Sequence, residues 1–97
     1  MVDKRQIPQY TIRMKPQQRY QAVLTKHIGE SDETSYFTSP YKRQLIREVT
    51  SMLYDCKYEC DMAFVVVCDT ARNFKELYNA KITNDNGEFV VRRTFLY

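Results

Sequence analysis

The sequence predicts an α+β domain in which one long helix packs across one face of a mostly antiparallel sheet of about five strands, in the order β-β-α-β-(short α)-β-β. Three observations indicate this class. Residues 62–68 form an unbroken apolar run, a helical period follows Pro40, and Asn86-Gly87 separates two alternating segments near the C-terminus. We expect a single compact domain over residues 1–97, because no repeat or linker divides it.

Composition is that of an ordinary globular protein, with 43% hydrophobic and 28% charged residues. The net charge of +3 permits a nucleic-acid partner without demanding one. No stretch approaches the roughly 18 apolar residues of a membrane span, so no membrane partner is expected. Three cysteines, an odd number, and no apolar signal segment after Met1 predict a reduced, cytoplasmic protein.

The first segments predict a β-hairpin. Residues 1–8 are a polar lead-in that we expect to be mobile. Residues 9–14 and 20–25 each alternate apolar with polar side chains, which is the period of a half-buried strand. Lys15-Pro16-Gln17-Gln18 lies between them and predicts the four-residue loop of the hairpin.

Residues 27–39 show no sustained period. They combine Gly29 with an acidic cluster and small hydroxyl side chains, so they predict the longest loop of the protein. Long loops are functional or mobile, and Tyr36 and Phe37 near the end of this one are expected to tuck against the core.

A long helix is predicted from Pro40 to about Lys57. Ser39 is suited to cap its first turn and Pro40 to occupy the first helical position, where the missing N–H costs nothing. Apolar side chains then recur at helical spacing, opposite a polar side: Tyr41, Leu45, Ile46, Val49, Met52, Leu53 and Cys56. This helix is expected to cover one face of the sheet.

The apolar run Met62–Cys68 predicts the central strand, because neither of its alternating faces suits water. Asp61 and Asp69 bracket this strand. They are about 26 Å apart at ~3.3 Å per residue, too far to act on one reaction centre. We interpret them as strand boundaries, with Asp69 as a possible N-cap.

A short helical turn is plausible after the central strand. Thr70 could cap this turn, and Ala71, Phe74, Leu77 and Tyr78 would share one side of it.

A second hairpin closes the chain around Asn86-Gly87, a dipeptide typical of type I′ turns. This register places Ile82 opposite Val91 and Tyr78 near Phe95, so that one face of the hairpin is consistently apolar.

No motif in the sequence points to catalysis. His27 is the only histidine, and no serine or cysteine stands in a motif that would pair with it. Cys56, Cys60 and Cys68 could join His27 in a tetrahedral zinc site. No Cys-x2-Cys knuckle exists, however, and buried thiols usually behave as small hydrophobes. We therefore expect no catalytic residue, no metal and no cofactor.

Basic and aromatic side chains are the more informative group. Arg92 and Arg93 point to opposite faces of a strand, so one of them shares the apolar side. Arginine and tyrosine are concentrated at protein interfaces and also bind single-stranded nucleic acid. An ordinary set of solvated charges is at least as plausible. The candidate partner-binding residues are Arg13, Lys15, Arg19, Tyr36, Phe37, Arg92, Arg93 and Tyr97.

The leading functional hypothesis is a small, non-catalytic binding protein that occupies a surface of a macromolecular partner, most simply a protein. By analogy, phages and mobile elements use chains of this size as inhibitors or adaptors. One alternative is a nucleic-acid-binding module that uses the basic first hairpin with Arg92 and Arg93, although the glycines and aromatic spacing of an RNA-recognition motif are missing. The other is an enzyme with an unrecognised site.

A dimer is also predicted. A single long helix covers only one face of the central strand, which leaves the second face thinly protected. We expect a homodimer, or another partner, to dock on this uncovered side.

Overall fold

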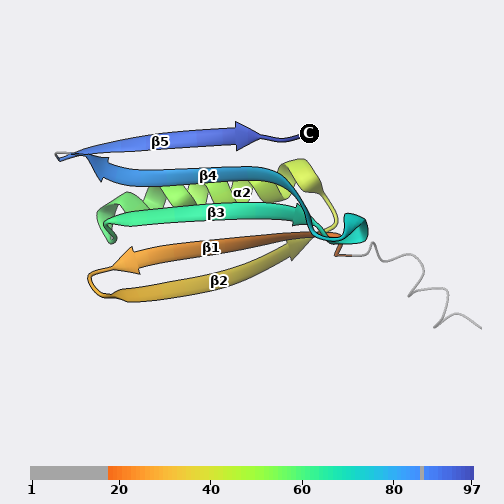
Figure 1. Ribbon diagram of the computed structural model, residues 1–97, viewed down its shortest axis with the longest axis horizontal. Coiled ribbons are helices and arrows are strands. Elements are labelled where there is room, and N and C mark those ends of the chain that lie inside the picture. The colour runs from red at the N-terminus through yellow and green to blue at the C-terminus, as the bar shows by residue number, and fades with distance from the viewer. Residues whose placement is uncertain (1–17, 86) are drawn as a thin grey trace, which may run out of the picture.

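Five antiparallel strands form one sheet, and one long helix lies across one of its faces (Figure 1). The computed structural model describes residues 18–85 and 87–97. The strand order is β2-β1-β3-β4-β5, which confirms the predicted fold class. The elements are β1 (Tyr20–Ile28), β2 (Ser31–Ser39), α2 (Lys42–Asp55), β3 (Met62–Asp69), β4 (Lys75–Asp85) and β5 (Glu88–Phe95), with single 3-10 turns at Cys56–Tyr58 and Thr70–Arg72.

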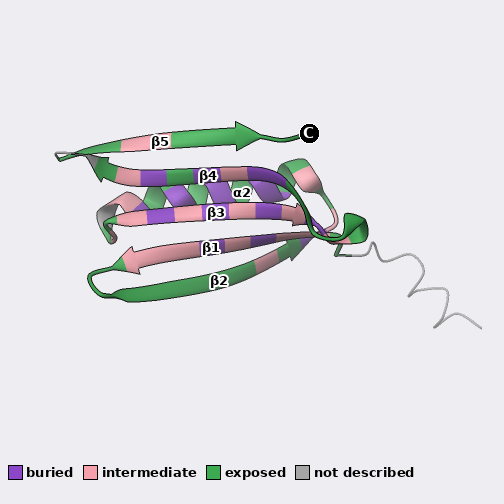
Figure 2. Ribbon diagram, in the orientation of Figure 1, coloured by how far each residue is buried: buried purple, intermediate pink, exposed green. Residues whose placement is uncertain are grey.

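The apolar run is the central strand, as predicted. In β3 the side chains of Ala63, Val65 and Val67 have no exposed surface and face α2. The alternate side chains of the same strand are only half-buried. Figure 2 shows the result: β3 alternates buried with intermediate positions, its neighbours β1 and β4 also carry buried positions, and the edge strands β2 and β5 are largely exposed.

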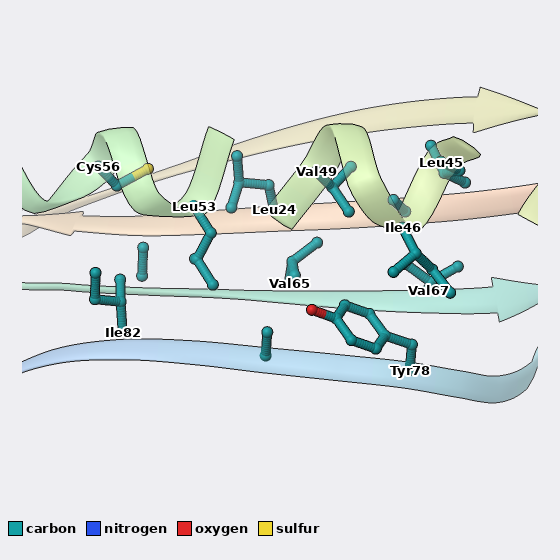
Figure 3. Close-up of a cluster of buried hydrophobic side chains, with 13 residues drawn as sticks. Leu24, Leu45, Ile46, Val49, Leu53, Cys56, Val65, Val67, Tyr78 and Ile82 are labelled. Atoms are coloured by element: carbon teal, nitrogen blue, oxygen red, sulfur yellow. The ribbon is translucent and has the colours of Figure 1, made fainter. Parts of the chain in front are cut away.

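The helix supplies the other half of the core. Leu45, Ile46, Val49 and Leu53 share one side of α2 and pack with buried side chains of β1, β3 and β4 (Figure 3). Burying each such side chain stabilises the fold by about 1.5–3 kcal/mol. Just before the helix, the Ser39 hydroxyl accepts a hydrogen bond from the Tyr41 N–H at 3.0 Å. This bond holds the chain where it turns from β2 into the helix.

The N-terminal half of the sheet differs from the prediction. Residues 27–39 are not a loop: β1 continues to Ile28, the chain turns at Gly29 with φ +63°, and β2 follows. The predicted strand at residues 9–14 lies outside the described residues. In the described part of the chain, β1 pairs with β2 on one side and with β3 on the other. Periodicity missed β2 because an exposed edge strand with polar side chains on both faces carries no apolar alternation.

The segment after β3 also differs. Only Thr70–Arg72 is helical, as one 3-10 turn, and Asp69 rather than Thr70 caps it by accepting from the Ala71 N–H at 3.0 Å. Phe74 has a φ of +58°, so the chain reverses there and β4 begins at Lys75. The predicted short helical turn is therefore present but ends at Arg72, and Leu77 and Tyr78 belong to β4.

The C-terminal hairpin has the predicted register. Ile82 pairs with Val91 and Tyr78 with Phe95. The turn includes Gly87 at φ +86°, while Asn86 lies outside the described residues. Arg93 then shares a face with Val91 and Phe95, as the alternation of a strand requires.

Candidate functional site

The sheet face opposite α2 is the first candidate surface, and we call it the open face. Side chains of β1 and β3 form its centre, where Val23 pairs with Val66 and Phe64 lies two positions away on β3, opposite Thr25. The three apolar side chains are half-buried, and none of them belongs to the hydrophobic cluster under α2. Tyr36 of β2 lies beside Val23 and is 67% exposed. The open face therefore presents an apolar stripe that continues into an aromatic edge.

Charges lie toward opposite margins of the open face. On the β4–β5 side, Lys81 and Arg92 are directly opposite each other across the two strands, and like charges so placed repel. Neither cation forms an ion pair with another described side chain. On the β2 side, Asp32 contacts Nδ1 of His27. One margin therefore carries this basic pair, with Glu76 further along β4, and the other carries an acidic group.

A groove between α2 and β5 is the second candidate surface, and we call it the arginine groove. The helix packs mainly against β1 to β4, which leaves β5 beyond its margin (Figure 1). The resulting groove has a volume of about 610 Å³. Asp55 lies among its polar lining residues. Three arginines and three aromatic rings line it from two sides: Arg43, Arg47 and Tyr54 from α2, and Arg93, Phe95 and Tyr97 from β5 and the residues that follow it.

Arg93 is fixed in the groove by a buried hydrogen-bond network. Its Nε–H donates to the Tyr78 hydroxyl at 3.0 Å, and that hydroxyl lies 2.7 Å from the Thr50 Oγ1. Because the Tyr78 oxygen accepts from Arg93, its own proton is free to be donated to Thr50. The guanidinium also lies 5.2 Å from the Phe95 ring centre. Its remaining four N–H groups are therefore available while its position is set.

Two other basic side chains form ion pairs within the protein. Arg19 makes two hydrogen bonds to the Asp69 carboxylate, at 2.8 and 2.7 Å, and Lys26 pairs with Glu59 at 2.8 Å. The bonds from Arg19 hold the pKa of Asp69 below its usual range. The same bonds raise the pKa of Arg19, and the bond to Glu59 raises that of Lys26.

The three cysteines are free thiols. Burial raises the pKa of Cys56 to about 11, and burial also raises the pKa of Cys60 and of Cys68. Since the thiolate is the nucleophile and the metal ligand, these shifts disfavour both roles. Within residues 18–85 and 87–97, no group of His, Cys, Asp and Glu is placed to hold a metal ion.

None of the helices in the described part of the chain has the length and apolarity to cross a bilayer.

The predicted contact residues do not form one patch. Arg13 and Lys15 lie outside the described residues. Arg19 is held by Asp69, and Phe37 packs against the core from the helix side. Neither of these two is a free contact group.

The remaining predicted residues divide between the two surfaces. Tyr36 and Arg92 lie on the open face, whereas Arg93 and Tyr97 line the arginine groove. Sequence reasoning left out four groove residues, Arg43, Arg47, Tyr54 and Phe95. Their spacing was the available signal: positions 43, 47 and 54 share one side of a helix, and 93 and 95 share one side of a strand.

Comparisons with family models, curated proteins and solved structures found no match to this chain. Function must therefore be inferred from the two surfaces themselves.

Proposed function

We propose that the protein is a non-catalytic binding protein that docks onto a protein surface through its open face. The observation that carries this proposal is the apolar stripe around Val23, Phe64 and Val66, which α2 leaves uncovered. A contiguous apolar surface rimmed by polar groups is typical of a protein interaction site. The raised thiol pKa values support a non-catalytic role, because they remove the strongest nucleophiles from consideration.

The occupant that fits the open face best is a second copy of the chain. A two-fold axis parallel to β3 lays β2 of one copy over β5 of the other. The basic pair Lys81 and Arg92 then faces the margin that carries Asp32, and Phe64 meets its own copy near the axis. The Lys81–Arg92 pair and Asp32 carry opposite charges, and the two-fold axis makes this contact occur twice.

The size of the face is also adequate for a dimer. Five strands spaced about 4.8 Å apart and roughly eight residues long give a projected area of about 600 Å². Standard interfaces bury about 800 Å² of accessible surface per partner, and a corrugated face exceeds its projection. The helix side stays outward in this dimer, so each protomer keeps its arginine groove accessible.

We also propose that the protein works in a reducing compartment, the cytoplasm. Cys56, Cys60 and Cys68 are free thiols in the structure, and disulfides are rare where thiols are kept reduced.

A charge exchange tests the proposal. Light scattering on the full chain should give twice the 11.6 kDa of one chain. Arg92→Asp and Asp32→Arg should each weaken the dimer about tenfold, because each sets like charges against each other. The double variant should recover most of the loss. Arg43→Asp, an equal change of charge on the helix side, is the matched control and should leave the dimer intact.

Three results would overturn the second copy as occupant. They are a monomeric mass at every concentration, a dimer indifferent to both single changes, and a loss that the double variant does not recover. A monomer that binds a different protein in an Arg92-dependent way would keep the open face as the docking surface but reject self-association.

A further inference from the structure

We propose that the arginine groove binds nucleotides of a single-stranded nucleic acid, with phosphates on its arginines and bases on its aromatic rings. This site is separate from the open face and does not depend on the dimer. The proposal stands on the cations, on the hydrogen-bond network that fixes one of them, and on the exposed rings between them.

The arginines lie on the two sides of the groove. Arg43 and Arg47 are one helical turn apart, which sets them about 6 Å from each other along α2, and Arg93 faces them from β5. In the described part of the chain none of the three forms an ion pair. Planar guanidinium groups bind phosphate oxygens through two parallel hydrogen bonds, so unpaired arginines facing one groove favour a polyanionic ligand.

Arg93 is prepared for such a ligand before it arrives. Tyr78 has no exposed surface and Thr50 is 6% exposed, so the network that receives the Nε–H is rigid and dry. A surface arginine loses rotamer freedom when it binds, whereas Arg93 has already lost much of it on folding. Phosphate binding at this position therefore costs less conformational entropy.

Three exposed aromatic rings also line the groove. Tyr54, Phe95 and Tyr97 are 43%, 51% and 54% exposed, although a folded chain usually buries such side chains. The Lys42 ammonium lies 3.8 Å from the Tyr97 ring centre and adds a cation beside that ring. Exposed rings interleaved with cations are how proteins bind single strands, because every base has a face that can stack.

The rings also decide between the two polyanions that could occupy the groove. An acidic peptide would satisfy the arginines equally well, since carboxylates match the guanidinium fork. Its Asp and Glu side chains have no planar group for the rings, whereas each nucleotide carries one. The groove follows α2 from Arg43 to Tyr54, about 16 Å at 1.5 Å per residue, which accommodates a short run of nucleotides. The Asp55 carboxylate lies beside Tyr54 and favours bases over phosphates at that end.

The decisive experiment compares two neighbouring arginines. Fluorescence anisotropy with a labelled single-stranded oligonucleotide about ten nucleotides long, at about 50 mM salt, measures binding to the full chain. Arg93→Gln should weaken binding about tenfold. It should also reduce the slope of log affinity against log salt concentration by about 0.7. Arg92→Gln removes the same charge one residue away, on the opposite face, and should leave the affinity unchanged. Phe95→Ala should cost about tenfold or more through lost stacking.

Four other binding results would overturn all or part of this proposal. Absence of binding at low salt, or a loss in Arg92→Gln without one in Arg93→Gln, overturns the groove as the site. A glutamate-rich peptide that binds as tightly, with the same dependence on Arg93, overturns the nucleic acid in favour of an acidic peptide. If AMP at an equal concentration displaces the oligonucleotide, the groove binds a base and a phosphate as proposed. The ligand is then a free nucleotide, and the single strand is overturned.

Discussion

The two faces of the central strand differ in exposure although they share one backbone. Val65 has no exposed surface and lies under α2, while Val66 is half-buried on the open face. A single apolar run therefore serves two purposes: alternate residues hold the fold together, and their neighbours remain available for contact. Apolar character alone does not tell these purposes apart, because only the position of α2 assigns each residue to one of them.

Replacing each of these two valines by aspartate gives the largest expected contrast. Val65→Asp places an unpaired carboxylate in the core and should destabilise the protein by about 3–5 kcal/mol. That is a large share of the roughly 5–15 kcal/mol that stabilises a domain. Val66→Asp should leave the monomer folded, with a loss below about 1 kcal/mol, because water reaches the open face.

Urea unfolding of both variants at low protein concentration, followed by mass measurement, checks this contrast. We expect Val66→Asp to be a folded monomer that unfolds near the wild-type urea concentration, and Val65→Asp to unfold at a much lower urea concentration. Equal destabilisation by the two substitutions would mean that the open face is part of the core of a single chain.

The two hairpins show why sequence predicted one half of the sheet better than the other. The β4–β5 register followed from Asn86-Gly87 and from apolar pairs such as Ile82 with Val91. The β1–β2 hairpin has only Phe37 on β2 in contact with the core, so alternation gave no signal for that strand. Edge strands that bury little leave a weak pattern, and their position is set by pairing with a neighbour.

The candidate surfaces were predictable only in part, for a related reason. Alternation alone placed Arg92 and Arg93 on opposite faces. The groove needed a fact that no local pattern contains, namely that α2 stops short of β5 and leaves a gap. Tyr78 illustrates the same limit: the hairpin register placed it near Phe95, but no local pattern showed that its hydroxyl anchors Arg93.

Tyr78→Phe has the next largest expected effect on stability. Tyr78 is buried on the sheet face under α2, which we call the covered face, and its hydroxyl connects this face to the arginine groove. The ring stays in the core, but the buried Thr50 hydroxyl loses its partner, which should cost about 1–3 kcal/mol. Thermal or urea unfolding measures the loss. Adding Thr50→Val removes the orphaned hydroxyl, so the double variant should be less destabilised than the sum of the single variants.

The nucleotide-binding readout separates this positioning role from a purely structural one. Arg93 keeps its charge in Tyr78→Phe but loses the bond that fixes it, so oligonucleotide affinity should fall by less than in Arg93→Gln. Unchanged affinity in folded Tyr78→Phe would show that Arg93 needs no anchor.

The smallest effect concerns Asp69, which is the one buried charged side chain among the described residues. The hydrogen bonds from Arg19 lower its pKa in the folded state, so the ion pair stabilises the protein fully above the carboxyl's unfolded pKa of about 3.9. This stabilisation disappears as pH falls through the lower folded value. We expect Asp69→Asn to unfold at a lower urea concentration than wild type at pH 7, and the difference to shrink toward pH 2.

Solvent exposure limits the stabilisation by this ion pair. The Arg19 side chain is 45% exposed, so water can replace much of its interaction with the Asp69 carboxylate. Glu59→Gln provides the control. It breaks the pair with Lys26, in which the Glu59 side chain is 59% exposed, and should barely move the urea midpoint at either pH. Equal shifts in the two variants would mean that burial at the end of β3 adds nothing to the Asp69 pair, and the covered face would then differ from the open face only in its apolar side chains.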